Sequence, residues 1–355
     1  YFTYAEVVEL VDTHDSKSCA ARHEGSIPSF GTMKLFFDLL ITIGILITAL
    51  PAVILLYSKC KRPESWEYKH PRLSILLAVM LFIGTLTLIW GSFIEPHLLI
   101  VRKQTIDLEN IKQPITIVFM ADFQVGKYKQ TDWVKKVVTK TRALKPDIVL
   151  LGGDQIDNAF FNPTETSYLR PLEKLVQSIP TYAIHGNHEY GISCNKGIEN
   201  KCRNIGDVSI ETKKTLETFG IRYLQNEMEE ITINDTSFYL YGGDSYWAQK
   251  IDYSALKTRT KEIPTIALIH NPSFLLDPHP EDIDLTLSGH THGGQIRLPL
   301  IGPIGLVDNQ LPRKLYKGYH TLGTGGNIYV TSGVGETATR ARLFNPPEII
   351  HITIK

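Results

Sequence analysis

The stretch Ser288-Gly289-His290-Thr291-His292-Gly293-Gly294-Gln295 places two histidines two residues apart between glycines. The apolar run 283–287 before it predicts a short strand, so both histidines follow a strand end. Neutral imidazole is the commonest side-chain metal ligand, and glycines let the backbone and ions approach closely. A glycine-rich turn with two exposed histidines has the same sequence. A metal site therefore follows only if the rest of the chain supplies partners.

Four other short apolar runs also end in metal-type ligands. They are followed by Asp122-Phe123-Gln124, Gly153-Asp154-Gln155-Ile156-Asp157, Gly186-Asn187-His188-Glu189 and His270. Helical spacing at 133–144 and 169–179 separates the first three runs, and this alternation predicts an α/β fold with helices flanking a sheet. Because ligands in such folds gather at the carboxyl ends of strands, we expect one shared site.

In this order, the motifs resemble those of the calcineurin-like metallophosphoesterase family: Asp-x-His, Gly-Asp-x-x-Asp, Gly-Asn-His-Asp/Glu, a His, and Gly-His-x-His. The resemblance covers about residues 96–355 and extends to the membrane-anchored bacterial phosphodiesterase-like subgroup. The subgroup features are Glu95-Pro96, Gly333-Val334-Gly335, Arg340, Arg342 and Pro347-Glu348-Ile349. The resemblance implies a four-layer α/β/β/α sandwich, here preceded by two transmembrane helices.

The resemblance also implies two divalent metal ions. One ion is expected to bind Asp122, Asp154 and His292, and the other to bind Asp154, Asn187, His270 and His290. Two cations about 3.5–4 Å apart can share a bridging hydroxide and clamp the attacking and leaving oxygens of an in-line displacement. A bridging carboxylate suits Asp154, whereas the neutral amide of Asn187 avoids excess negative charge where a phosphate must bind.

The catalytic residues implied by the resemblance are His188, with Asn187 beside it and Asp157 nearby. His188 is expected to protonate the leaving oxygen or to stabilise the transition state, oriented by a carboxylate such as that of Asp157. A helix cap or another supporting role without direct chemistry is the alternative for Asp157.

Gln124 departs from the family pattern, which has histidine there as a ligand of the first ion. A neutral amide oxygen is a harder and weaker ligand than imidazole, so we expect Mn²⁺ as the preferred metal, with Mg²⁺, Fe²⁺ or Zn²⁺ as alternatives. The same change could leave the first ion weakly bound.

Two apolar runs precede the motifs, at about 35–57 and 73–94, and each is long enough to cross a bilayer. The loop between them holds Lys59, Lys61, Arg62, Lys69 and Arg72, which by the positive-inside rule favours a cytoplasmic loop and an extracytoplasmic C-terminal domain. The sequence therefore predicts a multi-pass cell-membrane protein with a two-helix anchor at 33–97 and a metallophosphoesterase domain at 98–355.

Residues 1–32 lack either structural period, and we expect them to be a mistranslated or disordered extension, with Met33 as the start. Cys194 and Cys202 share one polar loop and are either a local disulfide or two free thiols. The span 297–326 is rich in glycine and proline and is expected to be a loop that shapes specificity.

The formal net charge of zero gives no field that would attract nucleic acid, and two helices without intramembrane polar clusters make no transport pathway. The expected activity is metal-dependent hydrolysis of a phosphoester, favouring a phosphodiester, in a phospholipid, a lipid-linked substrate or a small molecule. A UDP-diacylglucosamine-type pyrophosphate is an alternative substrate if the domain faces the cytoplasm. A membrane-anchored binding or scaffold protein with a degenerate metal site is the alternative function. The sequence leaves the oligomeric state open.

Overall fold

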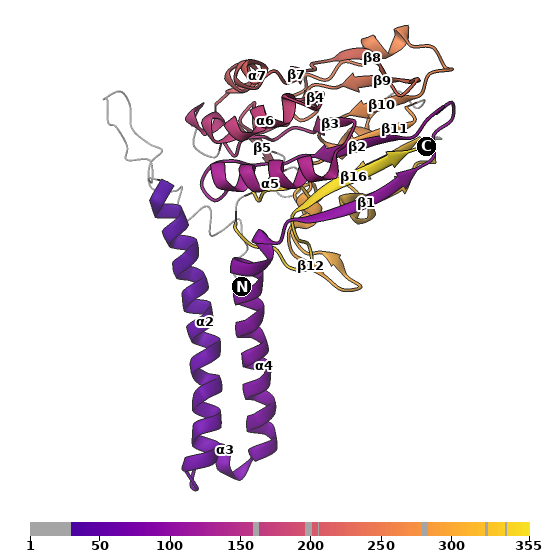
Figure 1. The fold of residues 1–355 in the computed structure, drawn as a ribbon. Helices are drawn as coiled ribbons and strands as arrows, with labels where there is room; N and C mark the ends of the chain where they lie inside the picture. The colour runs from indigo at the N-terminus through magenta and orange to yellow at the C-terminus, as the bar shows by residue number, and fades with distance from the viewer. Residues whose placement is uncertain are drawn as a thin grey trace, which may run out of the picture.

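The protein is described by a computed structural model that covers residues 30–158, 163–195, 201–204, 206–278, 283–323, 326–337 and 339–355. Figure 1 shows two long helices lying side by side and projecting together from one side of an α/β domain. The expected extension at 1–32 lies almost entirely outside the described residues.

The helical hairpin consists of α2 (Phe30–Lys61), α3 (Trp66–Lys69) and α4 (Pro71–Ile89), and a π-helical turn (Trp90–Ile94) and a 3-10 turn (Glu95–His97) follow it. Two stretches, Leu35–Lys61 and Pro71–His97, are long and apolar enough to span a membrane. Most of their large apolar side chains are exposed, so these helices are not packed into the core of the domain. Thr85 donates a hydrogen bond to Thr48 (2.8 Å) across the pair.

The first sheet has the strand order β1-β16-β2-β3-β4-β7 and is parallel except where β16 pairs with β2. Apolar residues buried on both faces explain why these short runs form central strands. Its strands are β1 (Ile100–Ile106), β2 (Ile115–Met120), β3 (Ile148–Leu151), β4 (Thr181–Ala183), β7 (Arg222–Tyr223) and β16 (Glu348–Ile354).

The second sheet has the order β14-β15-β11-β10-β9-β8, with parallel central strands and an antiparallel strand at each edge. Its strands are β8 (Glu227–Ile233), β9 (Thr236–Gly242), β10 (Thr265–Leu268), β11 (Leu285–Ser288), β14 (Gly318–Thr321) and β15 (Asn327–Val330).

Three apolar clusters make the domain a four-layer sandwich. The first sheet packs on α5 (Thr131–Leu144), η3 (Pro163–Leu172), α6 (Glu173–Val176) and α7 (Ser209–Thr218). The two sheets pack face to face through residues such as Phe119, Leu150 and Leu268. The outer face of the second sheet is covered by the short 3-10 helices η4 (Ser254–Thr258), η5 (Pro272–Leu276) and η7 (Arg313–Tyr316). The α/β/β/α sandwich is therefore confirmed, although its fourth layer consists of 3-10 turns and loops.

Two other expectations need revision. The stretch predicted as a helix at 169–179 begins as a 3-10 helix, in which Pro171 can donate no backbone hydrogen bond. The span 297–326 is not wholly a loop, because it contains the small hairpin β12 (Arg297–Leu298) and β13 (Gly302–Pro303), η7 and β14.

The polar loop that holds the cysteines forms a second small hairpin. In it β5 (Ile192–Asn195) and β6 (Lys201–Asn204) pair with Cys194 opposite Cys202. The side chains of these two residues lie outside the described part of the chain, so the choice between a disulfide and free thiols stays a prediction.

Candidate active site

The carboxyl ends of the central strands of both sheets meet at one edge of the sandwich. The loops after β2, β3 and β4 come from the first sheet, and those after β10 and β11 come from the second. Direct contacts join the two sets: the backbone N–H of His290 donates to Asp122 Oδ1 (2.9 Å), and Asn271 Nδ2 donates to Asn187 Oδ1 (3.1 Å). The structure thus brings all the predicted site residues into one buried region.

Glycines allow these loops to approach more closely than side chains would permit. A Cβ atom added to Gly186 would lie 2.1 Å from Asp154 Oδ1, and one added to Gly289 would lie 2.6 Å from Asp122 Oδ2. The glycines of these motifs are therefore required by contact with the acidic residues, and not only by turn geometry.

Five site residues other than glycine have backbone conformations in the left-handed region: Asp122 (φ 56°), Gln124 (46°), Asp154 (52°), His290 (68°) and His292 (48°). Such conformations cost on the order of 1–3 kcal/mol each and cluster at functional sites, where the surrounding structure enforces them. The strain here falls on the residues that the motifs single out.

Each of the four motif histidines directs its Nδ1 atom at a carbonyl oxygen. His270 contacts Gly152 O (2.7 Å), His188 contacts Asp157 O (2.5 Å), His292 contacts Gly335 O (3.3 Å), and His290 contacts Asn187 Oδ1 (2.9 Å). Because a carbonyl only accepts, each Nδ1 must carry the proton when the ring is neutral. The Nε2 atoms are then left as acceptors or metal ligands, as is usual for histidines in metal sites.

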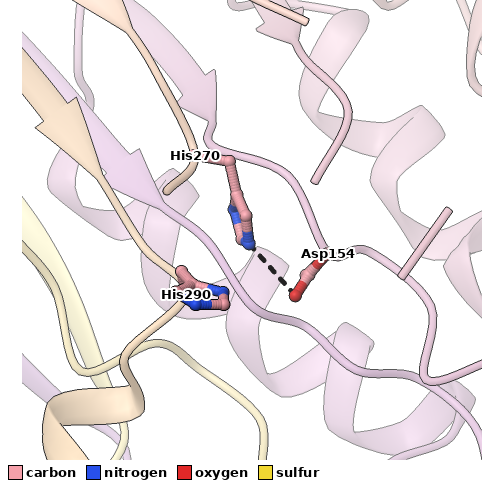
Figure 2. A group of neighbouring side chains, drawn as sticks. All are labelled: Asp154, His270 and His290. Carbon is pink, nitrogen blue, oxygen red and sulfur yellow. Dashed lines mark ion pairs between the residues drawn. The ribbon is translucent and has the colours of Figure 1, made fainter. Parts of the chain in front are cut away.

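Three of these side chains form the tightest ligand group. Figure 2 shows Asp154, His270 and His290 turned toward one another. One ligand atom from each lies within 4.8 Å of the others, and His270 Nε2 is 3.1 Å from Asp154 Oδ2. This group contains three of the four side chains expected at the second ion.

The residues expected at the first ion lie beside this group, with Asp122 Oδ1 3.9 Å from His270 Nε2. His292 Nε2 is 3.8 Å from Asp122 Oδ1, and Gln124 Nε2 donates to Asp154 Oδ2 (3.0 Å). This hydrogen bond leaves the Gln124 carbonyl oxygen free to act as a ligand, because Gln124 Oε1 has no hydrogen-bond partner among the described residues.

Burial and neighbouring charges shift the pKa values of several site residues in opposite directions. Burial raises the pKa of Asp122 to about 7, against the influence of His270. Burial opposes the ionisation of Asp154, but His270 and His188 hold its pKa below the ordinary value. Burial opposes the protonation of His270, but Asp154 and Asp122 raise its pKa to about 9. The buried carboxylates thus attract positive charge.

His188 lies at the exposed side of this region. Its side chain is 18% exposed, compared with 0% for His270 and 1% for His292, and its Nε2 atom is 3.9 Å from Asp154 Oδ2. The contact that orients the ring is the main-chain oxygen of Asp157, and not its carboxylate as the sequence suggested. Burial lowers the pKa of His188, but the carboxylates of Asp154 and Asp157 outweigh this and raise it.

Two supporting features were missed from the sequence. The buried Glu189 carboxylate accepts hydrogen bonds from the backbone N–H groups of Gly186 (2.7 Å), Asp154 (3.2 Å) and Gln155 (2.7 Å), which ties two ligand loops together. The other feature is a fully enclosed ion cluster of Lys129, Glu336 and Arg342 behind His292. For Glu189 the only sequence signal was its place directly after the Gly-Asn-His motif.

Comparison with known proteins identifies the family. The model of the calcineurin-like phosphoesterase family matches residues 115–294. An uncharacterized metallophosphoesterase of Helicobacter pylori (strain ATCC 700392 / 26695) is 32% identical over 82% of this chain and 74% of its own length. The phosphodiesterase YaeI of Escherichia coli K12 is 29% identical over 66% of this chain and 81% of its own. Among solved structures, TT1561 of Thermus thermophilus is similar with a TM-score of 0.38 and 13% identity, over 63% of this chain and 92% of that one. The family match and the Helicobacter relative together establish that the chain belongs to the calcineurin-like phosphoesterase family.

Proposed function

We propose that this metallophosphoesterase is a phosphodiesterase with a dinuclear metal site, and that it acts on a phospholipid or another lipid-linked phosphoester. One observation carries the metal proposal. Asp122 Oδ2, Gln124 Oε1 and His290 Nε2 are buried and have no hydrogen-bond partner among the described residues. Buried polar atoms are normally bonded, so three such atoms in one site fit the role of metal ligands.

The donor set suits two cations that share Asp154. One would be held by Asp122, Asp154, Gln124 and His292, and the other by Asp154, Asn187, His270 and His290. Divalent cations at these positions supply Lewis acidity and positive charge for phosphoryl transfer. The Asn187 oxygen accepts hydrogen bonds from His290 and Asn271, which together use both of its lone pairs, so it would exchange one of these bonds for the ion.

His188 is the residue proposed to handle the leaving group. Its Nδ1 atom is occupied by the Asp157 carbonyl, so Nε2 is the atom that can give a proton to the departing oxygen. Its greater exposure suits contact with a substrate that arrives from outside, whereas His270 and His292 are enclosed. Asp157 is proposed to act as a positioning residue through its main-chain oxygen and through the charge of its carboxylate.

Manganese is the proposed metal. The set Asp122, Asp154 and Gln124 offers oxygens beside a single imidazole, and such a set favours Mn²⁺ or Mg²⁺ over Zn²⁺. A site with imidazole in place of Gln124 would have the opposite preference.

The proposed location is the membrane, with 33–97 as the anchor and 98–355 as the catalytic domain on the extracytoplasmic side. Support comes from the length and apolar surface of the two helices and from the basic residues in the loop that joins them. An anchored site lies close to lipid headgroups, which is the reason for favouring a lipid phosphoester.

The test is hydrolysis of a chromogenic phosphodiester by the detergent-solubilised full chain with added Mn²⁺. Asp154→Asn and His290→Ala are each expected to remove activity and Mn²⁺ binding, whereas the surface change Glu211→Gln should leave both intact. The alternative of a binding or scaffold protein with a degenerate site predicts no metal-dependent activity in the wild type. Activity that persists in both site variants contradicts the proposed active site.

A further inference from the structure

The hairpin of β12 and β13 carries an exposed apolar tip that the fold itself does not require. Leu300 is fully exposed, and Ile301 and Ile304 are 58% and 52% exposed. With the half-exposed Ile296 and with Phe344 (61%), they account for five of the seven exposed large apolar residues that the structure describes beyond residue 98. We call these five residues the apolar patch: Ile296, Leu300, Ile301, Ile304 and Phe344. Contiguous exposed apolar surface of this kind marks an interaction site.

Two residues of the apolar patch have unfavourable backbone conformations. Leu300 has φ 68° and Phe344 has φ 52°, in the left-handed region where glycine and asparagine are preferred. Neither residue gains burial within the chain, because both are exposed. A large apolar side chain kept in such a conformation without internal packing suggests that it packs against something outside the chain.

Hydrogen bonds fix the apolar patch beside the end of the second long helix. The N–H of Arg297 donates to Leu343 O (2.9 Å), and the N–H of Arg342 donates to Gly91 O (2.8 Å). The N–H of Phe344 donates to the buried carboxylate of Glu95 (3.0 Å). Gly91 and Glu95 both belong to the second candidate span, Pro71–His97. In Figure 1 the hairpin projects from the side of the domain from which the helices also project.

The composition of the hairpin fits a lipid surface better than a protein surface. Residues 296–306 contain one charged residue, Arg297, and no acidic residue. Pro299 and Pro303 have no N–H groups, which reduces the number of backbone donors that would lose water on entering a bilayer. Gly91 and Glu95, which bond to the segment that carries Phe344, lie in the same turns as Trp90, Phe93 and Ile94, whose apolar side chains are also exposed. The same end of the second span therefore exposes apolar side chains that would face lipid if the helices span.

The hairpin is joined directly to the ligand loop. Arg297 Nη1 donates to Gly293 O (2.8 Å), and a Cβ added to Gly294 would lie 2.4 Å from Pro303 Cβ. If the hairpin contacts a bilayer, its depth therefore determines how far His290 and His292 lie from the bilayer surface.

We propose that the apolar patch inserts into the interfacial layer of the bilayer that holds the helices, and that it holds the active site against lipid headgroups. The inference rests on the proposed membrane insertion of α2 and α4 and specifies the substrate class as a phosphoester presented by a bilayer.

Photocrosslinking tests the contact on the full chain. The photoreactive residue p-benzoylphenylalanine replaces Leu300, Ile210 or Leu46 in separate variants, reconstituted in vesicles of phosphatidylethanolamine and phosphatidylglycerol. Ile210 is the matched control, because it is 76% exposed but lies on α7, away from the helices in Figure 1, and Leu46 reports on helix insertion.

Lipid adducts are expected after irradiation at positions 46 and 300 and not at 210. Adducts at 46 without adducts at 300 overturn the proposal while leaving the anchor intact. Lack of adducts at both positions contradicts both the membrane insertion of the helices and the proposed contact of the apolar patch. A protein adduct at 300, including one with a second copy of the chain, also overturns it.

A second variant separates membrane contact from folding. Leu300→Asn places a polar residue that tolerates the left-handed conformation at the tip. Two p-nitrophenyl alkyl phosphodiesters with the same reactive group are compared: a soluble one with a methyl group and one with a long alkyl chain that anchors it in the vesicle. The variant is expected to lose at least about tenfold in rate on the anchored ester only, and Ile210→Asn should change neither rate. Equal rates of variant and wild type on both esters, or equal losses on both, contradict the proposal. A wild type that hydrolyses neither ester refutes the phosphodiesterase function and leaves the crosslinking result to decide the membrane contact.

Discussion

Replacing Glu189 by glutamine changes one buried carboxylate that contacts no proposed metal position directly. Its two oxygens accept backbone N–H groups from the loops that follow β3 and β4, at Gly186, Asp154 and Gln155. Those loops carry Asp154, Asn187 and His188. The substitution keeps the size of the side chain and removes the second acceptor oxygen together with the charge.

The expected cost follows from the hydrogen bonds. Both carboxylate oxygens of Glu189 accept a hydrogen bond from a backbone N–H. Whichever way the amide of glutamine is turned, its NH₂ group therefore faces at least one of these N–H groups, and that donor loses its acceptor. Hydrogen bonds to a charged group contribute about 1.5–3 kcal/mol, and an unsatisfied buried donor costs about 1–3 kcal/mol. Removing the charge offsets part of this loss of stability, because the charged carboxylate is itself unfavourable when buried, and burial raises the pKa of Glu189 to about 7. We expect the free energy of unfolding to fall by about 2–4 kcal/mol.

Metal binding should weaken as well, because Glu189 holds the main chain at Asp154. Loss of an outer hydrogen bond to a ligand commonly costs about 10–100-fold in metal affinity. Urea denaturation and Mn²⁺ titration calorimetry of the detergent-solubilised chain measure the two effects, and Glu211→Gln on the exposed face of α7 serves as control. A loss of less than about 1 kcal/mol with unchanged Mn²⁺ affinity would refute the positioning role.

Three further changes test other parts of the site. Gln124→His should raise activity with Zn²⁺ relative to Mn²⁺, and an unchanged ratio of the two rates would show that residue 124 binds no metal. Gly186→Ala should destabilise the chain by at least about 1–3 kcal/mol and abolish activity, because its Cβ would lie 2.1 Å from Asp154 Oδ1; the unfolding midpoint checks this. Glu165 has its pKa raised to about 8 by burial and by Asp157, so the folded state holds a proton that the unfolded state releases above about pH 4.5. Stability should therefore fall as the pH rises from about 5 to 8, and Glu165→Gln should reduce that fall in urea midpoints measured at both pH values.

The order of the motifs was sufficient to predict the fold and the gathering of the site. Each ligand-type residue follows a short apolar run, and the carboxyl ends of neighbouring strands meet by topology alone. The sequence could not show which atom of each residue makes the contacts within the site. The contact of His188 with the main-chain oxygen of Asp157 depends on the turn at 154–157. From the sequence we expected the side-chain carboxylate of Asp157 to orient the His188 ring instead.

The burial of charged residues was also not predicted from the sequence. Lys129 is about 200 residues from Glu336 and Arg342 in the sequence, and nothing in the sequence predicts that the three are buried together as they are. Long side chains of this kind are mostly exposed, and only tertiary contacts reveal the exceptions. The hairpin at 297–303 was missed for a local reason, since Pro299, Gly302 and Pro303 are also the residues expected in an irregular loop.

The buried cluster has a consequence for how the helices relate to the active site. Arg342 donates from its backbone to Gly91 O (2.8 Å) and from its guanidinium to Ser332 O (2.8 Å) and Gly335 O, and Gly335 O also contacts His292 Nδ1.

Three hydrogen bonds, through Arg342 and Gly335, thus connect Gly91 at the end of the second candidate span with the proposed metal ligand His292. Lys129 Nζ donates to Pro96 O (2.6 Å) in the 3-10 turn, and Lys140 Nζ donates to Leu99 O (2.6 Å) directly before β1, so the segment that leads from the helices into β1 is held as well. A flexible tether would need none of these contacts. These contacts hold the helices and the loops of the site in one arrangement, in which the hairpin of the apolar patch projects from the side of the domain from which the helices project.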